Sequence, residues 1–387
     1  MRILHTIPTV DPSSGGPVEG LKQFCNIYLV SGHDVEVASL DSPEFVRNCS
    51  FPVKVFALGP SWGTYRYSLH ATSWLKANIA SYDMVFINGI WNYNAVATYR
   101  ALFETNIPYA VFTHGMLDPY FKRRFPLKHL KKLIYWKYVL YDILHNAAAV
   151  LFTCEEEMLL ARQSFAKYQV RESVVPYGTF GPDCDTVVAA GEFLVKYPQL
   201  QGNRLAISLG RIHPKKGTDM LIQAFADTLA NDPAWHLVIV GPDQIGWQKH
   251  LISLAVNLGI AKRITWTGML TGALKWGAIA ASEVFVLPSH QENFGIVVAE
   301  AMSCSVPVII SNKVNIWREI DSYSAGYVGE DTLRGTKDSF ARWMALSSVE
   351  IAEMRIRSKI CFDKLFDYHA TSEQFLGILE RITYSGR

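Results

Sequence analysis

Residues 289–302 read SHQENFGIVVAEAM, and two carboxylates, Glu292 and Glu300, stand eight positions apart in this stretch. The apolar pattern predicts a buried strand over residues 284–287 and a helix from residue 294 onward. Glu292 then lies at the strand-to-helix turn, and Glu300 lies about two helical turns further along. A carboxylate in so apolar a helix is costly to bury without a partner.

The partner of these carboxylates decides what the stretch does. A ligand rich in hydroxyl groups or a cation would satisfy them, and so would a structural ion pair within the protein. For Glu300 alone, the sequence does not separate the ligand from the ion pair. For both carboxylates together in this setting, we favour the ligand.

The bulk composition is that of an ordinary globular protein. At 387 residues the chain is too long for one ordinary core, so two domains are expected. A net charge of +2 gives no indication of a nucleic-acid partner. Six scattered cysteines without a Cys-x-x-Cys pair argue against zinc and a disulfide framework and favour a reducing compartment. The sequence shows no signal-peptide core and no apolar run of transmembrane length, so a cytoplasmic location is expected.

Short apolar strands alternate with amphipathic helices, and this rhythm restarts near residue 205. The pattern predicts two doubly wound α/β halves, each a parallel sheet covered by helices on both faces. A connector is expected at residues 176–202, which are rich in Gly, Pro and Asp. Strands are expected at residues 2–7, 35–40, 53–58, 84–88, 109–113 and 150–153, and then at 205–209, 237–240, 264–267, 284–287 and 308–310.

A basic loop follows the first strand of the second half. Gly210 and Arg211 end that strand, and Lys215 and Lys216 come just before the next helix. Cations beside the positive end of a helix suit a phosphate group, because the helix dipole and the side chains act together. By itself, a solvated basic turn is the better explanation. The expectation that this loop and the Glu292 turn lie at one sheet edge is an argument in favour of phosphate binding.

Two loops in the first half also lie at the carboxyl ends of strands. Gly15 and Gly16 permit close backbone approach, and Pro17 suits the first turn of a helix. They indicate phosphate only weakly, since a tight strand-to-helix turn explains them about as well. His114, followed by Gly115, can reach into a cleft to hydrogen-bond a sugar hydroxyl or a reacting group, although most single histidines are structural.

Residues 120–141 combine basic with aromatic side chains. A helix of this kind can rest on anionic lipid, which would give a peripheral contact with the inner membrane face. A charged outer face over a packed inner face explains the same pattern and is slightly favoured. Nucleic acid is not expected as a partner, because nothing else in the chain is basic. The basic residues are Lys122, Arg123, Arg124, Lys128, Lys131, Lys132 and Lys137.

Together these motifs resemble those of retaining glycosyltransferases of the GT-B fold, in the family 4 class that uses nucleotide-sugar donors. The resemblance covers nearly the whole chain and is most specific at Glu292 and Glu300, separated by seven residues. It implies two Rossmann-like domains facing a central cleft. The acceptor-side domain would comprise residues 1–178, joined by a C-terminal helix over about residues 368–387, and the donor-side domain residues 179–367.

The family's roles carry over to the matching positions of this chain. The resemblance implies that Arg211 and Lys216 hold the donor diphosphate. It implies that Glu300 accepts hydrogen bonds from the ribose hydroxyls and that Glu292 faces the donor sugar. The other implied donor contacts are Gly241 as a supporting contact, the backbone of Asn293, Phe294, Gly295 and Ile296 around the sugar and phosphates, and Met269 and Leu270 at the base.

In the first half, the resemblance implies that Gly15 and Gly16 close over the β-phosphate and that His114 contacts the donor sugar near the reacting carbon. The implied reaction moves a hexose from a UDP-sugar, for example UDP-glucose, to a glycan or lipid-linked acceptor in polysaccharide biosynthesis. Fixed cations would stabilise the departing diphosphate, so no metal and no other cofactor are expected. The alternatives are a nucleotide-sugar 2-epimerase and a non-catalytic nucleotide-sugar binding protein.

Overall fold

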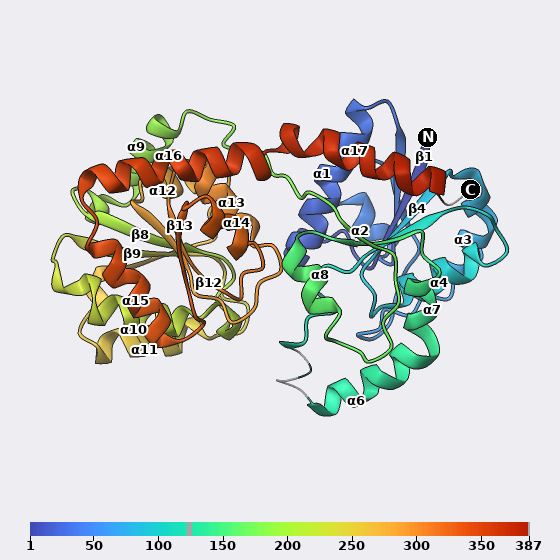
Figure 1. Cartoon of the computed structure of the whole chain (residues 1–387), viewed down its shortest axis with the longest axis horizontal. Coiled ribbons are helices and arrows are strands. Elements are labelled where there is room, and N and C mark those ends of the chain that lie inside the picture. Colours follow the sequence, from blue (N-terminus) through green and yellow to red (C-terminus); the bar gives the residue numbers. More distant parts are fainter. Residues whose placement is uncertain (121, 123–125, 386–387) are drawn as a thin grey trace. The chain divides into compact units, whose positions relative to one another are not determined.

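Two parallel sheets, one in each of two units, carry the chain in the computed structural model, which describes residues 1–120, 122 and 126–385. The N-terminal unit comprises residues 1–177 and 372–387, and the C-terminal unit comprises residues 178–371 (Figure 1). This confirms the predicted fold class of two doubly wound parallel-sheet halves.

The N-terminal sheet has the order β3-β2-β1-β4-β5-β6-β7. Its inner strands are almost completely buried, as expected for strands covered on both faces. The chain leaves β1 for β2 on one side and later returns to β4 on the other, so the winding reverses between β1 and β4. The strands are β1 (Arg2–Ile7), β2 (Asp34–Ser39), β3 (Val55–Ala57), β4 (Met84–Asn88), β5 (Tyr109–Phe112), β6 (Ala149–Phe152) and β7 (Glu172–Val174).

Helices cover this sheet, and the last helix of the chain joins them. Phe375 of that helix packs against Phe24 and Tyr28, with ring centroids 4.5 and 5.5 Å apart. Figure 1 shows the red C-terminal helix beside α1. The helices are α1 (Gly16–Val30), α2 (Pro43–Arg47), α3 (Ala71–Asn78), α4 (Tyr93–Leu102), α6 (Pro126–Tyr135), α7 (Tyr141–His145), α8 (Glu155–Ala161) and α17 (Tyr368–Ser385), which crosses between the units.

The C-terminal sheet has the order β10-β9-β8-β11-β12-β13, and its winding reverses between β8 and β11. Its strands are β8 (Arg204–Leu209), β9 (Trp235–Val240), β10 (Ile264–Gly268), β11 (Val284–Leu287), β12 (Val308–Ser311) and β13 (Gly326–Gly329). Its helices are α9 (Thr186–Lys196), α10 (Thr218–Asp227), α11 (Gln248–Asn257), α12 (Gly272–Ala280), α13 (Ile296–Ser303), α14 (Trp317–Ser322), α15 (Leu333–Met344) and α16 (Ser348–Leu365).

The structure corrects the expected connector at residues 176–202. This stretch contains the helix α9, whose N-cap Asp185 accepts hydrogen bonds from the backbone N–H groups of Val187 and Val188. Its turn residues therefore mark the start of a helix rather than a continuous linker. Two sheet-edge strands, β7 and β13, were also not predicted, because each is short and only half-buried.

Candidate functional site

The site predicted in the second half lies where the winding of the C-terminal sheet reverses. β8 and β11 are parallel neighbours, so the loops that follow them, residues 210–217 and 288–295, lie at one sheet edge. This confirms the expectation that the basic loop and the Glu292 turn share an edge. Open α/β sheets bind ligands beyond the carboxyl ends of strands at such a reversal.

The backbone joins these two loops. The N–H of His290 donates to the carbonyl O of Lys215 at 2.8 Å. Gly217 has a φ of 65°, and a Cβ added to it would lie 2.3 Å from the carbonyl O of Pro288. Glycine is therefore required at this position both for its conformation and for the close approach of the second loop.

Lys216 and Glu292 form an ion pair between the two loops, through Nζ and Oε2. Both side chains are mostly buried, with exposed fractions of 19% and 21%. The backbone of Glu292 is held from the loop after β12, because its N–H donates to Lys313 and its carbonyl accepts from Asn315, at 2.9 and 3.1 Å. Two predicted site residues thus meet directly.

Arg211 is exposed, and within the described residues no hydrogen bond or ion pair holds its guanidinium group. The backbone beside it is fixed, since the N–H of Ile212 donates to the carbonyl of Pro242 at 3.0 Å. A Cβ on Gly241 would lie 1.9 Å from the carbonyl O of Gly210. Gly241 therefore lets the loops after β8 and β9 pack together, and its supporting contact with the donor stays a prediction.

The carboxylate of Glu300 is paired with Lys275 of α12, with Nζ and Oε1 3.0 Å apart. Nζ of Lys275 also lies 3.9 Å from the centroid of the Trp276 ring. The structural ion pair that was left open for Glu300 is therefore present. Its contact with ribose hydroxyls stays a prediction.

The remaining predicted donor contacts lie at the ends of strands or at the start of α13. Gly295 has a φ of 74° and precedes the first helical residue, Ile296. The α13 helix therefore begins two residues later than the expected position 294. Nδ2 of Asn315 donates to Oδ1 of Asn293 at 3.4 Å, and Phe294 packs edge-on against Phe366.

After β10, Met269 is 70% exposed whereas Leu270 is buried, and their contact with a base stays a prediction.

In the N-terminal unit, His114 follows β5 and has a φ of 48°. The left-handed conformation costs an L-residue about 1–2 kcal/mol. Nε2 of His114 is 3.2 Å from Oδ1 of Asn88, and Nδ2 of Asn88 is 3.2 Å from Nδ1 of His5. Burial lowers the pKa of His114 to about 4, and burial together with the neighbouring His114 lowers the pKa of His5 to about 3. Both rings are therefore neutral near pH 7.

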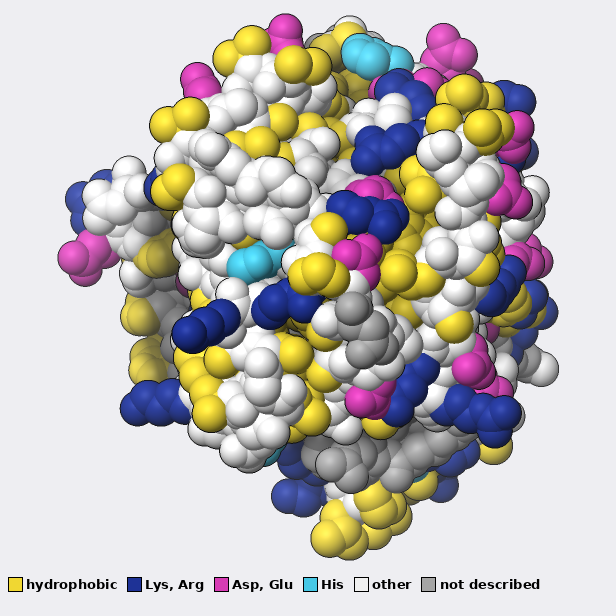
Figure 2. All heavy atoms as spheres, turned by 90° about the vertical axis from the view of Figure 1, so that its left-hand side faces the viewer, with side chains coloured by type: hydrophobic (Ala, Val, Ile, Leu, Met, Phe, Trp, Pro, Cys, Tyr) yellow, Lys and Arg dark blue, Asp and Glu magenta, His cyan; other side chains and the backbone are white. Residues whose placement is uncertain are grey.

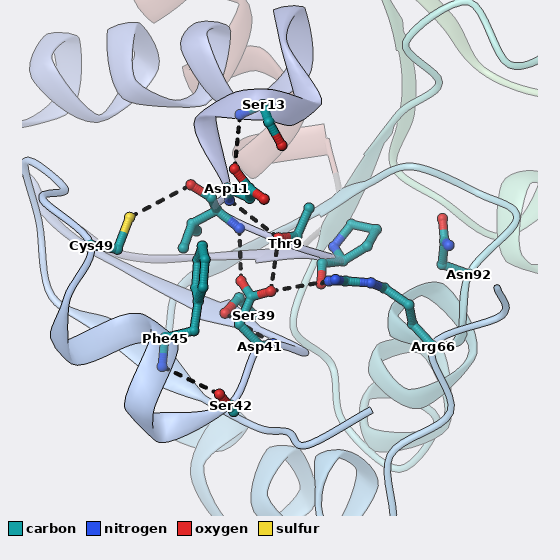
Figure 3. A network of polar contacts seen from close by, with 12 residues as sticks. Thr9, Asp11, Ser13, Ser39, Asp41, Ser42, Phe45, Cys49, Arg66 and Asn92 are labelled. Carbon is teal, nitrogen blue, oxygen red and sulfur yellow. Dashed lines mark hydrogen bonds and ion pairs between the residues drawn. The ribbon is translucent and has the colours of Figure 1, made fainter. Parts of the chain in front are cut away.

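The loop between β1 and the Gly15 turn is held by a buried carboxylate (Figure 3). Asp41, just after β2, accepts from Oγ1 of Thr9 at 2.7 Å and from the N–H of Val10 at 2.8 Å. Arg66 donates to Asp41 at 3.1 Å and also to the carbonyl of Pro8. Asp41 was not predicted as a site residue. The sequence signal that could have found it is its position as a polar residue directly after an apolar strand.

Gly15 and Gly16 themselves lie next to open space. Gly15 has a φ of 78°, and a Cβ added to either glycine would meet no atom within 4 Å. Asp11 connects the Asp41 cluster to this turn, because its carboxylate accepts from the N–H of Ser13 at 2.8 Å. The closure of this turn over a phosphate stays a prediction.

The basic segment forms α6, a π-helical turn (Trp136–Leu140) and α7. Residues 121 and 123–125, with Arg123 and Arg124, lie outside the described residues. No residue of α6 is fully buried, but Tyr135 at its end packs against Tyr65 and Trp91. Trp136, Leu140 and Tyr141 of the following turns are buried, so the packed inner face favoured for this segment is present at its C-terminal end. Large apolar side chains of the segment are exposed, and Nζ of Lys132 lies 4.3 Å from the centroid of the Trp91 ring. The exposed apolar residues are Leu127, Leu130, Leu133, Ile134 and Tyr138.

Charge is mixed on the face of the C-terminal unit that Figure 2 shows. Dark blue basic and magenta acidic side chains alternate there with apolar groups. A nucleic-acid-binding face would instead carry a continuous basic stripe.

Among residues 1–120, 122 and 126–385, no three His, Cys, Asp or Glu side chains gather closely enough to hold a metal ion. No helix in that part of the chain is both long and apolar enough to cross a bilayer.

Comparisons with known proteins give a consistent picture. Residues 15–178 match the model of the glycosyl transferase 4-like domain, and residues 192–346 match that of glycosyl transferases group 1. The D-inositol 3-phosphate glycosyltransferase of Rhodococcus opacus is 39% identical over 109 residues. That match covers 27% of this chain and 24% of the relative, so the chain matches about a quarter of the length of this curated relative.

Two solved structures resemble nearly the whole chain. HepE of Anabaena, in complex with UDP and glucose, is 18% identical with a TM-score of 0.78 over 98% of this chain and 100% of that chain. Sucrose-phosphate synthase of Thermosynechococcus elongatus is 19% identical with a TM-score of 0.78 over 100% of both chains. With its two matching family models and its two doubly wound sheets, the chain belongs to the GT-B glycosyltransferases of the family 4 class.

Proposed function

We propose that this chain is a retaining glycosyltransferase that moves a hexose from a UDP-sugar to a glycan or lipid-linked acceptor. The observation that carries the proposal is the Lys216–Glu292 ion pair, at the point where the C-terminal sheet reverses, beside Arg211, which has no ion-pair partner among the described residues. HepE, which shares the fold, is described as a complex with UDP and glucose, and this supports UDP-glucose as the first donor to test.

The cations of the site suit the chemistry of the departing group. When the bond between sugar and phosphate breaks, negative charge develops on the diphosphate. Arg211 can bind two of its oxygens at once, and Lys216 adds a point charge from the adjacent turn. Fixed positive groups that need no rearrangement stabilise such a charge most effectively. We propose that they act without a divalent metal.

The carboxylates have a different task. Glu292 and Glu300 accept hydrogen bonds from hydroxyl groups of the sugar and the ribose in this proposal. Lys216 pairs with Glu292 and Lys275 pairs with Glu300, so a lysine orients each carboxylate. The acceptor attacks the same face of the sugar that the diphosphate leaves, so no protein nucleophile is assigned.

A panel of nucleotide sugars tests the proposal directly. The full-length chain is incubated with UDP-, GDP- and ADP-hexoses, with and without oligosaccharide and lipid-linked acceptors. Release of nucleotide diphosphate and a glycosylated product, both dependent on acceptor, are expected with UDP-glucose. Isomerised sugar without acceptor would support the 2-epimerase instead. Tight donor binding without turnover under any acceptor would support the binding protein.

A second candidate property, peripheral membrane contact, is favoured by α6. This helix exposes Leu127, Leu130 and Ile134 beside Lys128 and Lys131. Apolar groups that insert at the headgroup level, together with nearby cations, suit an anionic bilayer surface. A lipid-linked acceptor would then be met at the surface where it resides.

Vesicle sedimentation tests this property. The protein should sediment with vesicles that contain anionic phospholipid, and less with purely zwitterionic ones. Leu130→Asp should weaken that binding because it places a charge in the apolar stripe. Val195→Asp on α9 is the matched control, since Val195 is 75% exposed in the other unit, and it should bind like the unaltered protein. Equal binding by both variants, or none by the unaltered protein, would refute the contact.

A further inference from the structure

The carboxylate of Glu157 lies at the centre of a set of buried hydrogen bonds in the N-terminal unit. Glu157 is in the first turn of α8 and is 4% exposed. Its Oε1 accepts from Oγ1 of Thr113 at 2.8 Å and from the N–H of Gly115 at 2.6 Å. Its Oε2 accepts from the N–H and from Oγ1 of Thr153, both at 2.8 Å. One side chain thus connects the loop after β5 to the end of β6.

A carboxylate is the side chain that suits all four of these donors. Each oxygen accepts two hydrogen bonds, which compensates for the removal of the charge from water. Glutamine has one acceptor oxygen, and its NH2 group would face two donors at the other position. The sheet itself does not require this cluster, because β5 and β6 already pair through their own backbones.

The residue between the two positions bound by Oε1 is His114. Its φ of 48° is a left-handed conformation that residues other than glycine seldom adopt. Such a conformation persists where its surroundings fix it, and it occurs most often at functional sites. Because Glu157 binds the residues on both sides, Thr113 and Gly115, it fixes this segment from both ends.

Asn88 orients the imidazole ring of His114, whereas Glu157 binds the residues on both sides of it. Nδ2 of Asn88 donates to the carbonyl of Thr6 at 3.2 Å, so Oδ1 of the same amide serves as the acceptor for His114. That oxygen is 3.2 Å from Nε2 of His114, and the hydrogen-bond network therefore places the ring proton on Nε2. Nδ1 is left as an acceptor, and within the described residues no hydrogen bond occupies it.

We infer that Glu157 is a positioning residue: it holds His114 in the left-handed conformation from which the ring reaches Asn88, so that Nδ1 can accept a hydrogen bond from a hydroxyl of the donor sugar. The sugar in this statement rests on the proposed function, whereas the hold on His114 rests on the hydrogen bonds alone. Glu157 itself touches no substrate. Nδ1 selects a group that carries a proton, such as a hydroxyl, over a phosphate or a carboxylate.

NMR of the ring nitrogens in full-length protein with ¹⁵N-labelled histidine tests the positioning without any turnover. The unaltered protein should show His114 protonated at Nε2 and not at Nδ1. Glu157→Gln should mix the two tautomers. Glu155→Gln is the matched control, because it removes an exposed carboxylate from the same turn of α8 and should leave the His114 signals unchanged. Unchanged His114 signals in Glu157→Gln would overturn the inference.

Turnover distinguishes positioning from a general effect on stability. Glu157→Gln should lower kcat by about 100-fold, the loss expected from a displaced contact group, without changing the dissociation constant of UDP. In a His114→Ala background, the same substitution should lower kcat by less than about twofold, because the residue that it positions is already gone. Equal losses in both backgrounds would show that Glu157 does not act through His114.

A second variant and the ring-nitrogen measurement distinguish failure of this inference from failure of the proposed function. Thr113→Val removes one of the four hydrogen bonds, so it should show the same pattern at smaller size if Glu157→Gln does not fold. An unaltered protein that transfers sugar to no acceptor would count against the proposed function. The ring-nitrogen measurement would still decide whether Glu157 holds His114.

Discussion

Arg211 and Lys216 carry the same charge in different electrostatic settings. Arg211 is exposed, and within the described part of the chain no ion pair neutralises it, whereas Lys216 is already paired with Glu292. A diphosphate would therefore meet a free guanidinium group at Arg211. At Lys216 it would have to share the cation with a carboxylate. The larger part of the charge stabilisation is expected from Arg211, because its fork also binds two oxygens at once.

Arg211→Ala should accordingly lower kcat by about 100- to 1000-fold, as the loss of one fixed group opposite a developing charge does. The fold should be unaffected, since the side chain is exposed. Initial rates with the donor, together with a thermal melt, measure both effects. Arg334→Ala is the control, because the Arg334 side chain is 92% exposed in the same unit and should be silent in both measurements. A near-normal rate for Arg211→Ala would refute the assigned role.

His114 also makes stability depend on pH. Burial lowers its pKa from 6.5 to about 4, so between these values the unfolded chain binds a proton that the folded chain does not. Stability is therefore fully present above pH 6.5 and is lost as the pH falls towards 4. The slope is about 1.4 kcal/mol per pH unit for one such group.

Melting temperatures at pH 7 and pH 5 measure this contribution. His114→Asn keeps a residue that tolerates the left-handed conformation but cannot titrate, so its melting temperature should fall less than that of the unaltered protein. Burial, the larger cause of the lowered pKa of His5, remains in both proteins and cancels in the comparison, and the substitution removes only the smaller contribution of His114. Equal decreases in the two proteins would contradict the assignment.

At the scale of elements, the strands were predictable because burial on both faces leaves long apolar runs. β4 and β11 have the predicted bounds. The elements that were missed carry weaker signals: β7 and β13 are half-buried edge strands, and α9 lies in a stretch whose turn residues suggested a linker. Their positions are set by pairing and packing within the sheet, which a local pattern does not contain.

The site could be predicted only as loops at strand ends. The alternation of strands and helices predicted that the loops after β8 and β11 share one edge, whereas the ion pair of Lys216 with Glu292 was not predicted. The groups that orient the site residues could not be predicted, because they come from other elements. Lys275 orients Glu300, and Glu157 binds on both sides of His114. Such partners become visible only when the topology is known.

Gly217 tests how closely the loops after β8 and β11 must approach. Gly217→Ala places an L-residue at a φ of 65° and a Cβ 2.3 Å from the carbonyl of Pro288. Gly202→Ala is the matched control, because Gly202 has a φ of 75° with nothing within 4 Å of the added Cβ. Both variants incur the conformational cost of about 1–2 kcal/mol.

Gly217→Ala should lose at least about 1 kcal/mol more than the control, because a backbone carbonyl must move. Denaturant unfolding measures this difference. Donor turnover should fall in Gly217→Ala alone, since moving Pro288 also moves the Glu292 turn. Equal stability and equal activity of the two variants would show that the close approach of the loops does not matter.

At the scale of the whole molecule, each unit carries its motifs in loops that follow the carboxyl ends of its parallel strands. In the C-terminal unit these are cations and carboxylates, and in the N-terminal unit a glycine turn and a neutral histidine. The chain crosses between the units twice, after Tyr177 and within α17 after Thr371. The proposed reaction draws its positive charge from the C-terminal unit alone, through Arg211 and Lys216.

This origin of the charge leads to the prediction that turnover needs no divalent metal. If Arg211 and Lys216 stabilise the departing diphosphate, excess chelator should leave the initial rate with the donor within about twofold of its untreated value, because no step depends on a bound ion. Rising salt should instead lower kcat/KM, since ions screen the attraction between the exposed Arg211 and the diphosphate. A rate that disappears with chelator and returns with magnesium would contradict the prediction. The Arg211→Ala variant separates the two sources of charge, because it should lose most of the salt dependence if the guanidinium group is the cation that the donor meets.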